Sequence, residues 1–563
     1  MIPNVTRGDR MTGIIVYALG EGKHNEHYDQ RLISGSDFVV AKWGVRCHDL
    51  GRDDAIAMAK WLDRPRRHHE KTVKDGHVWH CSLNIKHTDR QIDDGEWAEI
   101  AREFLVEMGF EHDVVDEDSV LGLRWAAFHH GASLAGNDHI HIVVNLVHDD
   151  GRVANVHCDY ARAQAAARVI ELRHGLESVE GREMGRSLKG YSQAERAKVE
   201  AQAWVSARSR YENGLGNSSL GGMVNVKWDA LSREHQYQLL SEELKVWIPR
   251  YRLAGVVRQC AVSSQSELEF VHRIREQGVW VRPRFAKGGM SSVEGYSVAL
   301  PPVPGEKPVF FSGIRLGNDL TLPRLRQGWG ERDSQQELTV AAWTVAGAGK
   351  RITGVVDETV VETAWDLEER LIEVIDALRF VDPHDVDAWA VVARQCSGVL
   401  WSMSRATEPE PGPLAHAAHA VGISAQTLKE PQSQPRVNLT GLISAARVGL
   451  LIAAKGEGIG SYMLVLQSMM ALTRAVAKAA AARREFEQAK RLELVWKSDL
   501  EYAYSTMNTR SQYRQYVSPF AKPVTAIGAE WAARQRTGQP APSAPQLSKP
   551  PAQNPQQRRE LKR

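Results

Sequence analysis

The first third of the chain alternates between strand-like and helix-like patterns. The pattern predicts β-strands at residues 2–6, 78–85, 121–130 and 139–147. The turn-rich segment GASLAGND, which precedes the last strand, predicts that the last two strands form an antiparallel hairpin. Apolar residues recur at helical spacing in 93–110, 158–176 and the short segment 12–19. Asp93, Asp159 and Thr12 are the expected N-caps, and Gly20 should end the short helix. The pattern predicts an α+β domain with a central antiparallel sheet flanked by helices.

The rest of the chain divides by changes in composition and periodicity. A helical segment at 263–278 precedes two strand-like segments, at 279–285 and 294–301, which predict a hairpin. The predicted domains are an N-terminal domain over 1–180, a connector over 181–224, an accessory α/β module over 225–334, a mainly helical region over 335–510 and a tail over 511–563. The tail is basic and rich in Pro and Gln, so we expect it to be disordered.

Composition narrows the class of protein without naming a function. The hydrophobic fraction is 43% and the charged fraction 25%, as in globular proteins, and the net charge of +2 predicts no general preference for acidic partners. The five cysteines include no CxxC pair, which argues against a thiolate zinc site and a disulfide framework. The start lacks a signal-peptide core, and no apolar run is long enough to span a membrane. We expect a cytoplasmic protein.

Histidines are concentrated where the chemistry is expected: 16 of the 21 lie before residue 175. His139 and His141 alternate in a strand, so their rings share one face with Asn145. A third histidine from the preceding strand would complete a metal site with open positions. His130 is the favoured third ligand and His129 the competitor, since the two neighbours face opposite ways. The alternative is that the pair is a coincidence of composition in a half-buried strand.

Tyr17 is a second candidate, near the end of the short predicted helix and before a glycine-flanked basic loop that contains Lys23. Most tyrosines in apolar segments pack through the ring and hydrogen-bond through the hydroxyl. Spacing alone therefore favours a packing role for Tyr17. His80, in the strand 78–85, is a further residue that an adjacent strand could bring to the site, although an ordinary strand histidine is the simpler interpretation.

The order of these segments resembles a known family. The run TGIIVYALGEGKHNEH, then VWHCSL, WAEIARE and LRWAAFHH…NDHIHIVVNLVHDDGR, is similar to the relaxases (mobilisation nucleases) of conjugative and mobilisable plasmids. These enzymes belong to the HUH endonucleases, named for a His-hydrophobe-His motif. The resemblance covers residues 1–180 and extends into the hairpin and the helical region.

The resemblance implies a mechanism and a set of site residues. Tyr17 matches the nucleophile, and His130, His139 and His141 match the metal triad. The interval between His130 and His139 is longer than is usual, and the resemblance makes Asp138 the candidate for the acidic residue that usually follows the first histidine. One divalent cation (Mn, Mg or Zn) would polarise the scissile phosphate. Asn145 is a candidate for orienting a ligand, although an asparagine that bonds to a turn at the end of the strand is the simpler interpretation. The product would be a 5′-phosphotyrosine and a free 3′-hydroxyl.

The implied substrate is single-stranded DNA at a transfer origin, and the implied partners are a type IV secretion coupling protein and accessory mobilisation proteins. Candidate DNA contacts combine cations with aromatic rings. They are Lys23, Trp280, Arg282, Arg284 and Phe285. A solvated hairpin is the alternative for the last four. Two other functions stay open: a rolling-circle replication initiator, and a non-catalytic DNA-binding accessory protein in which a metal is structural.

Overall fold

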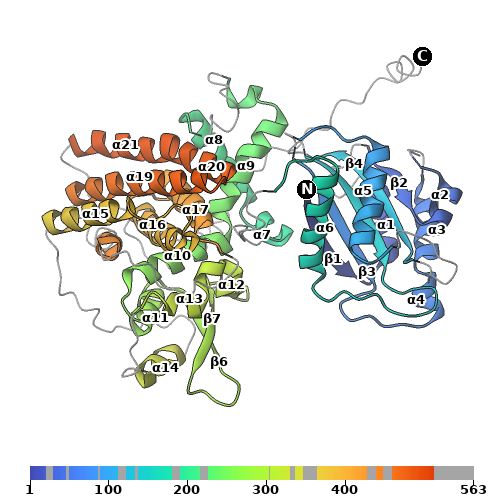
Figure 1. Cartoon of the computed structure of the whole chain (residues 1–563), viewed down its shortest axis with the longest axis horizontal. Coiled ribbons are helices and arrows are strands. Elements are labelled where there is room, and N and C mark those ends of the chain that lie inside the picture. Colours follow the sequence, from blue (N-terminus) through green and yellow to red (C-terminus); the bar gives the residue numbers. More distant parts are fainter. Residues whose placement is uncertain are drawn as a thin grey trace. The chain divides into compact units, whose positions relative to one another are not determined.

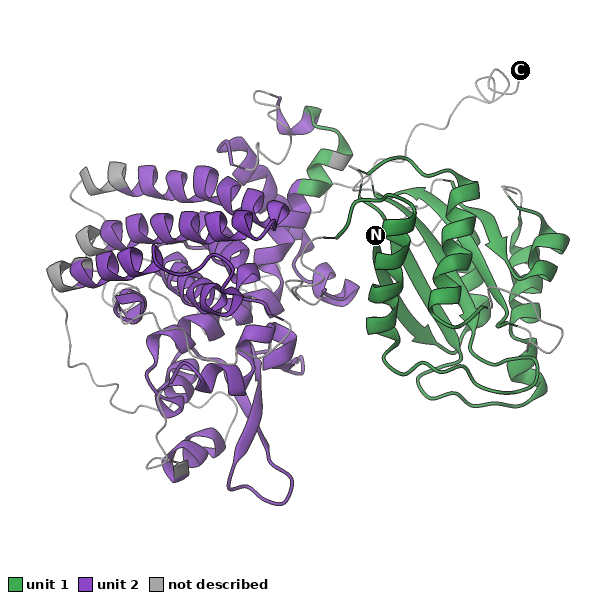
Figure 2. Ribbon diagram, viewed as in Figure 1, with its two compact units in different colours: residues 1–182, 230–238 green, residues 183–229, 239–563 purple. Residues whose placement is uncertain are grey.

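The computed structural model describes most of the chain and divides it into two compact units (Figure 2). Unit 1 contains Met1–Arg182 and Ala230–Gln238, and unit 2 contains Glu183–Asp229 and Leu239–Arg563. The described residues are 1–20, 29–45, 50–86, 89–111, 122–133, 137–179, 190–215, 226–302, 305–329, 336–345, 364–427, 439, 441–447 and 459–512.

Unit 1 is built on a five-stranded sheet in which every neighbouring pair is antiparallel. The spatial order is β1-β3-β5-β4-β2. The strands are β1 (Ile2–Gly8), β2 (Arg31–Gly35), β3 (Val78–Asn84), β4 (Trp125–Ala132) and β5 (Asp138–Asn145). The predicted hairpin is confirmed as the β4–β5 pair, in which β5 is the central strand of the sheet.

Helices cover the two faces of this sheet unequally. The helices are α1 (Met11–Leu19), α2 (Asp37–Trp43), α3 (Arg52–Leu62), α4 (Arg64–His68), α5 (Asp94–Glu107) and α6 (Asp159–Arg173). Helices α5 and α6 run side by side across one face (Figure 1), where Ile140, Ile142 and Val144 of β5 meet Phe104 and Ile170. Helices α1, α2 and α3 supply the smaller core on the other face, which contains Val143. The alternation of β5 therefore sends its even-numbered apolar residues into the larger core and its histidines to the opposite side.

Two of the three predicted N-caps are wrong. Helix α6 begins at Asp159, and its N-cap is Cys158, whose φ of 53° places it in the left-handed region. The carboxylate of Asp159 accepts from the indole N–H of Trp79 at 3.0 Å and pairs with Arg7 at 2.8 Å, so it anchors the helix to the sheet. Helix α1 begins one residue before Thr12, with Arg10 as its N-cap. The predicted cap Asp93 is confirmed, because its side chain accepts from the backbone N–H of Glu96.

Unit 2 joins a small sheet to a large set of helices, as predicted. The three-stranded sheet has the order β6-β7-β8, with β6 (Trp280–Phe285), β7 (Val293–Ala299) and β8 (Phe311–Ser312). The helices are α7 (Gln193–Ala197), α8 (Glu200–Glu212), α9 (Arg233–Trp247, whose residues fall in both units), α10 (Pro249–Ser263), α11 (Glu267–Glu276), α12 (Gly313–Leu316), α13 (Leu322–Arg326), α14 (Gln336–Thr344), α15 (Ala364–Leu378), α16 (Val386–Thr407), α17 (Pro413–Ser424), α19 (Ile459–Ala482), α20 (Phe486–Val495) and α21 (Glu501–Gln512).

The α+β fold class is confirmed in both units. The predicted connector contains two helices, α7 and α8, which belong to unit 2. Arg210 of α8 pairs with Asp499 at 2.6 Å, so α8 is tied to the helical part of that unit. The predicted tail lies outside the described residues, apart from the last two residues of α21. In the part of the chain that the structure describes, no helix is both long and apolar enough to cross a membrane.

Candidate functional site

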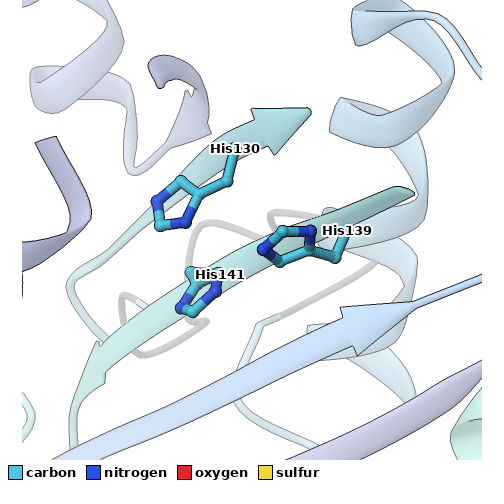
Figure 3. Close-up of side chains that lie close together, drawn as sticks. All are labelled: His130, His139 and His141. Atoms are coloured by element: carbon cyan, nitrogen blue, oxygen red, sulfur yellow. The ribbon is translucent and has the colours of Figure 1, made fainter. Parts of the chain in front are cut away.

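Three histidines meet on one face of the unit 1 sheet (Figure 3). His130 comes from the end of β4, and His139 and His141 come from β5 beside it. Each offers a ring nitrogen, and these three atoms all lie within 4.8 Å of one another. His130 is fully buried and His139 is partly exposed, so the cluster reaches the surface on one side. Three imidazole donors at this spacing fit one divalent cation with positions left for oxygen ligands.

A bulge in the hairpin lies at the end of β4, next to His130. The β4–β5 register shifts between His129 and Ala132, and Gly131 has a φ of 71° there. Glycine adopts this left-handed conformation without the steric cost that a side chain would add. The bulge brings the end of β4 back onto β5 after an interval that is long for the resembled family, so the extra residues do not separate His130 from His139.

His130 is held by the helix that also carries Tyr17. Its Nε2 lies 2.8 Å from the backbone oxygen of Ala18 in α1. A carbonyl oxygen only accepts, so Nε2 must carry the proton and Nδ1 the lone pair that can bind a cation. Helix α1 is itself fixed by Met11, Ile15 and Ala18, all of which are buried against the sheet.

Tyr17 lies beside the histidines. Its ring centroid is 6.4 Å from that of His130 and 6.2 Å from that of His141. The side chain is half-buried, which leaves part of the ring accessible to solvent. The structure thus brings together Tyr17 and the three predicted metal ligands, from α1, β4 and β5. A phenol beside a cation site is an arrangement that can place a nucleophile next to a metal-bound phosphate.

His80 also reaches this cluster, from the neighbouring strand β3. Its Nε2 lies 2.8 Å from Nδ1 of His141, and the two rings stack with centroids 4.9 Å apart. Its Nδ1 lies 2.9 Å from the hydroxyl of Thr6 in β1. Burial lowers the pKa of His80 to about 4, so the ring is neutral at pH 7.

A polar surface continues from the cluster across the edge of the sheet. Asn4 pairs with Ser82 across β1 and β3, and Ser82 pairs with His141 across β3 and β5. Opposed residues of antiparallel strands share a face, so these side chains lie on the same side as the histidines. Asn4 and Thr6 are exposed. The sequence showed the alternation of β1, but only the strand order reveals that its polar side chains adjoin the site.

Asp138 and His129 lie on the opposite face of the sheet from the histidine cluster. The carboxylate of Asp138 accepts from Nε2 of His129 at 2.7 Å and from the indole N–H of Trp97 at 2.8 Å. Nδ1 of His129 bonds to Asp94 at 2.7 Å, and Arg31 donates to the same carboxylate at 2.6 Å. The structure therefore does not bring the candidate acid Asp138 to the other candidate residues, and the competitor His129 belongs to a different cluster.

The charges of this second cluster compensate one another. Burial alone would lower the pKa of His129, but its bonds to Asp138 and Asp94 outweigh burial and raise it. Burial would likewise raise the pKa of Asp138, yet His129 and Trp97 hold it below its usual value. Asp94 behaves in the same way, with Arg31 as its main partner. These bonds connect α5 and β2 to the β4–β5 hairpin on the face of the sheet opposite the histidine cluster.

Asn145 lies on the same face as the histidines, but its side-chain amide hydrogen-bonds to backbone groups. The residue is fully buried at the far end of β5. Its Nδ2 donates to the backbone oxygen of Leu62 at 2.7 Å, and its Oδ1 accepts from the backbone N–H of Val147 at 3.1 Å. The first bond joins the end of β5 to the end of α3, and the second stabilises the chain just after β5.

Asn145→Ala should therefore lower stability rather than act on the chemistry directly. Two buried backbone groups would lose their partners, which costs about 1–3 kcal/mol. Urea unfolding measures the loss, and strand cleavage measured well below the melting temperature should stay close to that of the natural chain. A stable variant with abolished cleavage would instead give Asn145 a direct part in the reaction.

The candidate DNA-binding residues are divided between the two units. Lys23 lies outside the described residues. Trp280, Arg282, Arg284 and Phe285 all lie on β6 of unit 2. Arg282 and Arg284 are exposed, and the guanidinium of Arg282 lies 3.8 Å from the ring centroid of Phe310. Trp280 and Phe285 are half-buried and contribute less surface.

Comparison with protein families finds one match, which lies within unit 1. Residues 44–176 match the family model described as relaxase, MobA/VirD2-like, nuclease domain. No curated protein and no solved structure matches the chain. The matched segment contains His80 and all three histidines of the cluster, whereas Tyr17 precedes it. Residues 44–176, most of unit 1, are therefore similar to the nuclease domain of relaxases.

Proposed function

We propose that the chain is a relaxase that nicks one DNA strand at a transfer origin and later rejoins it. The observation that carries this proposal is Tyr17 beside His130, His139 and His141, and the match of residues 44–176 to a relaxase nuclease domain supports it. Such an enzyme acts on plasmid DNA in the cytoplasm. A coupling protein of a type IV secretion system and accessory mobilisation proteins would be its partners.

The chemistry is a transesterification at phosphorus. Bound to the three histidines, a divalent cation would polarise the scissile phosphate and offset the charge that develops on its oxygens. The hydroxyl of Tyr17 loses its proton and forms the new bond to phosphorus, while the bond from phosphorus to the 3′-oxygen breaks and that oxygen takes up a proton. A free phenol has a pKa near ~10, so Tyr17 needs this environment to react at neutral pH. The number of ester bonds is unchanged, so the 3′-hydroxyl can reverse the step.

The residues around the site support a single strand as the substrate. Asn4 and Thr6 expose neutral polar groups beside the cluster, which suit sugar and phosphate oxygens. Tyr17 and His139 are each partly exposed, so a DNA strand would approach the cluster from the side on which these two residues reach solvent. A nick needs only this one phosphate to be held, and its neighbours on the strand would follow the polar surface of β1 and β3.

The experiment that tests the proposal uses end labels to read the polarity of the link. Oligonucleotides covering both strands of the DNA that flanks the gene are labelled at either end and incubated with the protein and Mn²⁺ or Mg²⁺. We expect a covalent adduct on a denaturing gel that carries the 3′ label and a shortened free product that carries the 5′ label. An adduct with the 5′ label would contradict a 5′-phosphotyrosine. If no oligonucleotide from either strand yields an adduct, a non-catalytic accessory function is favoured.

We further propose that β6 contacts DNA in unit 2. Arg282 pairs with Ser297 and Arg284 with Gly295 in β7, so the two arginines share one face of the hairpin. A stacked, exposed guanidinium such as that of Arg282 can bind a phosphate while its plane remains ordered by the ring of Phe310.

The double change Arg282→Ala and Arg284→Ala should weaken DNA binding and reduce its salt dependence. Each lost phosphate contact lowers the slope of log K against log salt by roughly 0.7–0.9. Fluorescence anisotropy at several salt concentrations gives both quantities. Arg379→Ala is the matched control, because this arginine of unit 2 is 73% exposed and lies outside the hairpin. An unchanged slope in the double variant would remove β6 from the DNA interface.

A further inference from the structure

His80 occupies a place that the nuclease chemistry does not itself require. It lies between Thr6 and His141, at 2.9 Å from the hydroxyl and 2.8 Å from the ring nitrogen. The register of the sheet produces this chain of contacts: Thr6 is directly opposite His80, and His80 is opposite Val143, two residues along β5 from His141. The three side chains share the face of the cluster, so the arrangement follows from strand order and alternation together.

The bond between the two imidazoles fixes which nitrogen of His141 can bind a cation. Nδ1 of His141 is engaged with His80, so Nε2 is the atom that can act as the ligand. A ligating Nε2 needs its lone pair, and the proton of the ring then lies on Nδ1 and is donated to His80. His80 accepts through Nε2, carries its own proton on Nδ1 and donates it to Thr6.

We propose that His80 is a positioning residue that holds His141 in the ligating tautomer without adding negative charge to the site. The inference rests on the proposed function of the histidine cluster. Metal-bound histidines often donate their second N–H to a carboxylate, which orients the ring and increases its basicity. Here the partner is an uncharged imidazole, and His130 likewise has an uncharged partner, the backbone oxygen of Ala18.

An uncharged partner has a consequence for the substrate. A carboxylate behind His141 would offset part of the charge of a divalent cation and would repel the phosphodiester anion. With neutral partners, the cation keeps more of its attraction for the scissile phosphate. The carboxylates of Asp94 and Asp138 lie on the opposite face, where Arg31 and His129 bind them. The sheet therefore separates these two carboxylates from the face where a phosphate would bind.

Three variants of His80 distinguish the effect of orienting the His141 ring from the effect of the charge on its partner. His80→Phe removes the acceptor and should lower the affinity for Mn²⁺, measured by calorimetry without DNA, by about 10–100-fold. His80→Gln offers an uncharged acceptor and should restore most of that affinity. His80→Glu offers a charged acceptor and should match or exceed the natural affinity, yet cleave at least about tenfold more slowly at saturating Mn²⁺, with a higher KM for DNA. Thr6→Val should produce a smaller loss of the same kind as His80→Phe.

The controls make each outcome decisive. His157→Gln replaces an exposed histidine of unit 1 and should change nothing. Circular dichroism establishes that each variant is folded before its affinity is measured. Natural affinity in His80→Phe would overturn the positioning role, and so would a failure of His80→Gln to recover affinity in a folded protein. Natural cleavage rates in His80→Glu would overturn the argument from charge. If the natural chain binds Mn²⁺ but cleaves no DNA, the proposed function fails, while the affinities still decide the role of His80.

Discussion

Replacing Tyr17 with phenylalanine should abolish the covalent DNA–protein adduct. The variant lacks only the hydroxyl, so the ring can keep its place 6.4 Å from His130 and 6.2 Å from His141. Loss of the attacking oxygen removes the only bond that the protein makes to phosphorus in the proposed reaction. We expect the rate of adduct formation to fall by on the order of 10³-fold or more. Affinity for the same oligonucleotide, measured by anisotropy, should change little.

Tyr160→Phe is the matched control for this experiment. Tyr160 lies on α6, and its side chain is 60% exposed. Its loss of a hydroxyl should leave adduct formation at the natural rate. If the adduct persisted in Tyr17→Phe, the nucleophile would lie elsewhere, and Tyr28, outside the described residues, would be the first residue to replace. An adduct lost from both variants would indicate damage that does not depend on Tyr17.

Much of unit 1 could be predicted because its elements follow simple periodicities. The alternation in residues 139–147 placed Ile140, Ile142 and Val144 in the core and the two histidines on the other face, and the structure confirms that division. The helical spacing of apolar residues predicted α5, whose residues Ile100 and Phe104 are fully buried. These local patterns are dictated by burial on one face of each element, so they can be read from a single sequence.

The site was harder to predict wherever it depends on contacts between strands that are distant in sequence. The resemblance assigned Asp138 to the acidic position that usually follows the first histidine, but adjacent residues of a strand face opposite sides, and Asp138 accordingly bonds to His129 and Trp97. The contact of His80 with Thr6 and His141 depends on β3 lying between β1 and β5. Strand order is set by the packing of the whole sheet and leaves no local signal in the sequence.

His130→Ala and His129→Ala should separate the two faces of the sheet. His130 belongs to the histidine cluster, so its loss should lower the affinity for Mn²⁺ by at least about 100-fold and abolish cleavage. His129 bonds to the carboxylates of Asp94 and Asp138. Its loss leaves two partly buried acids short of a donor, which should cost about 1–3 kcal/mol of stability. The affinity of folded His129→Ala for Mn²⁺ should remain within a few-fold of the natural value.

The difference in Mn²⁺ affinity between the two variants identifies the ligand, because both variants lose a histidine side chain and both should lose stability. His130 is fully buried and bonded to Ala18, so its replacement also disturbs packing. Calorimetric titration with Mn²⁺ below both melting temperatures isolates the ligand from the fold. Removing the metal from the natural chain with a chelator should abolish cleavage, as His130→Ala does. When both proteins are compared without metal, the natural chain should still be more stable than His130→Ala. If His129→Ala lost the metal while His130→Ala kept it, the third ligand would be His129. The structure favours His130, because its ring stacks on that of His141 with centroids 4.2 Å apart, whereas His129 bonds to Asp94 and Asp138 on the opposite face.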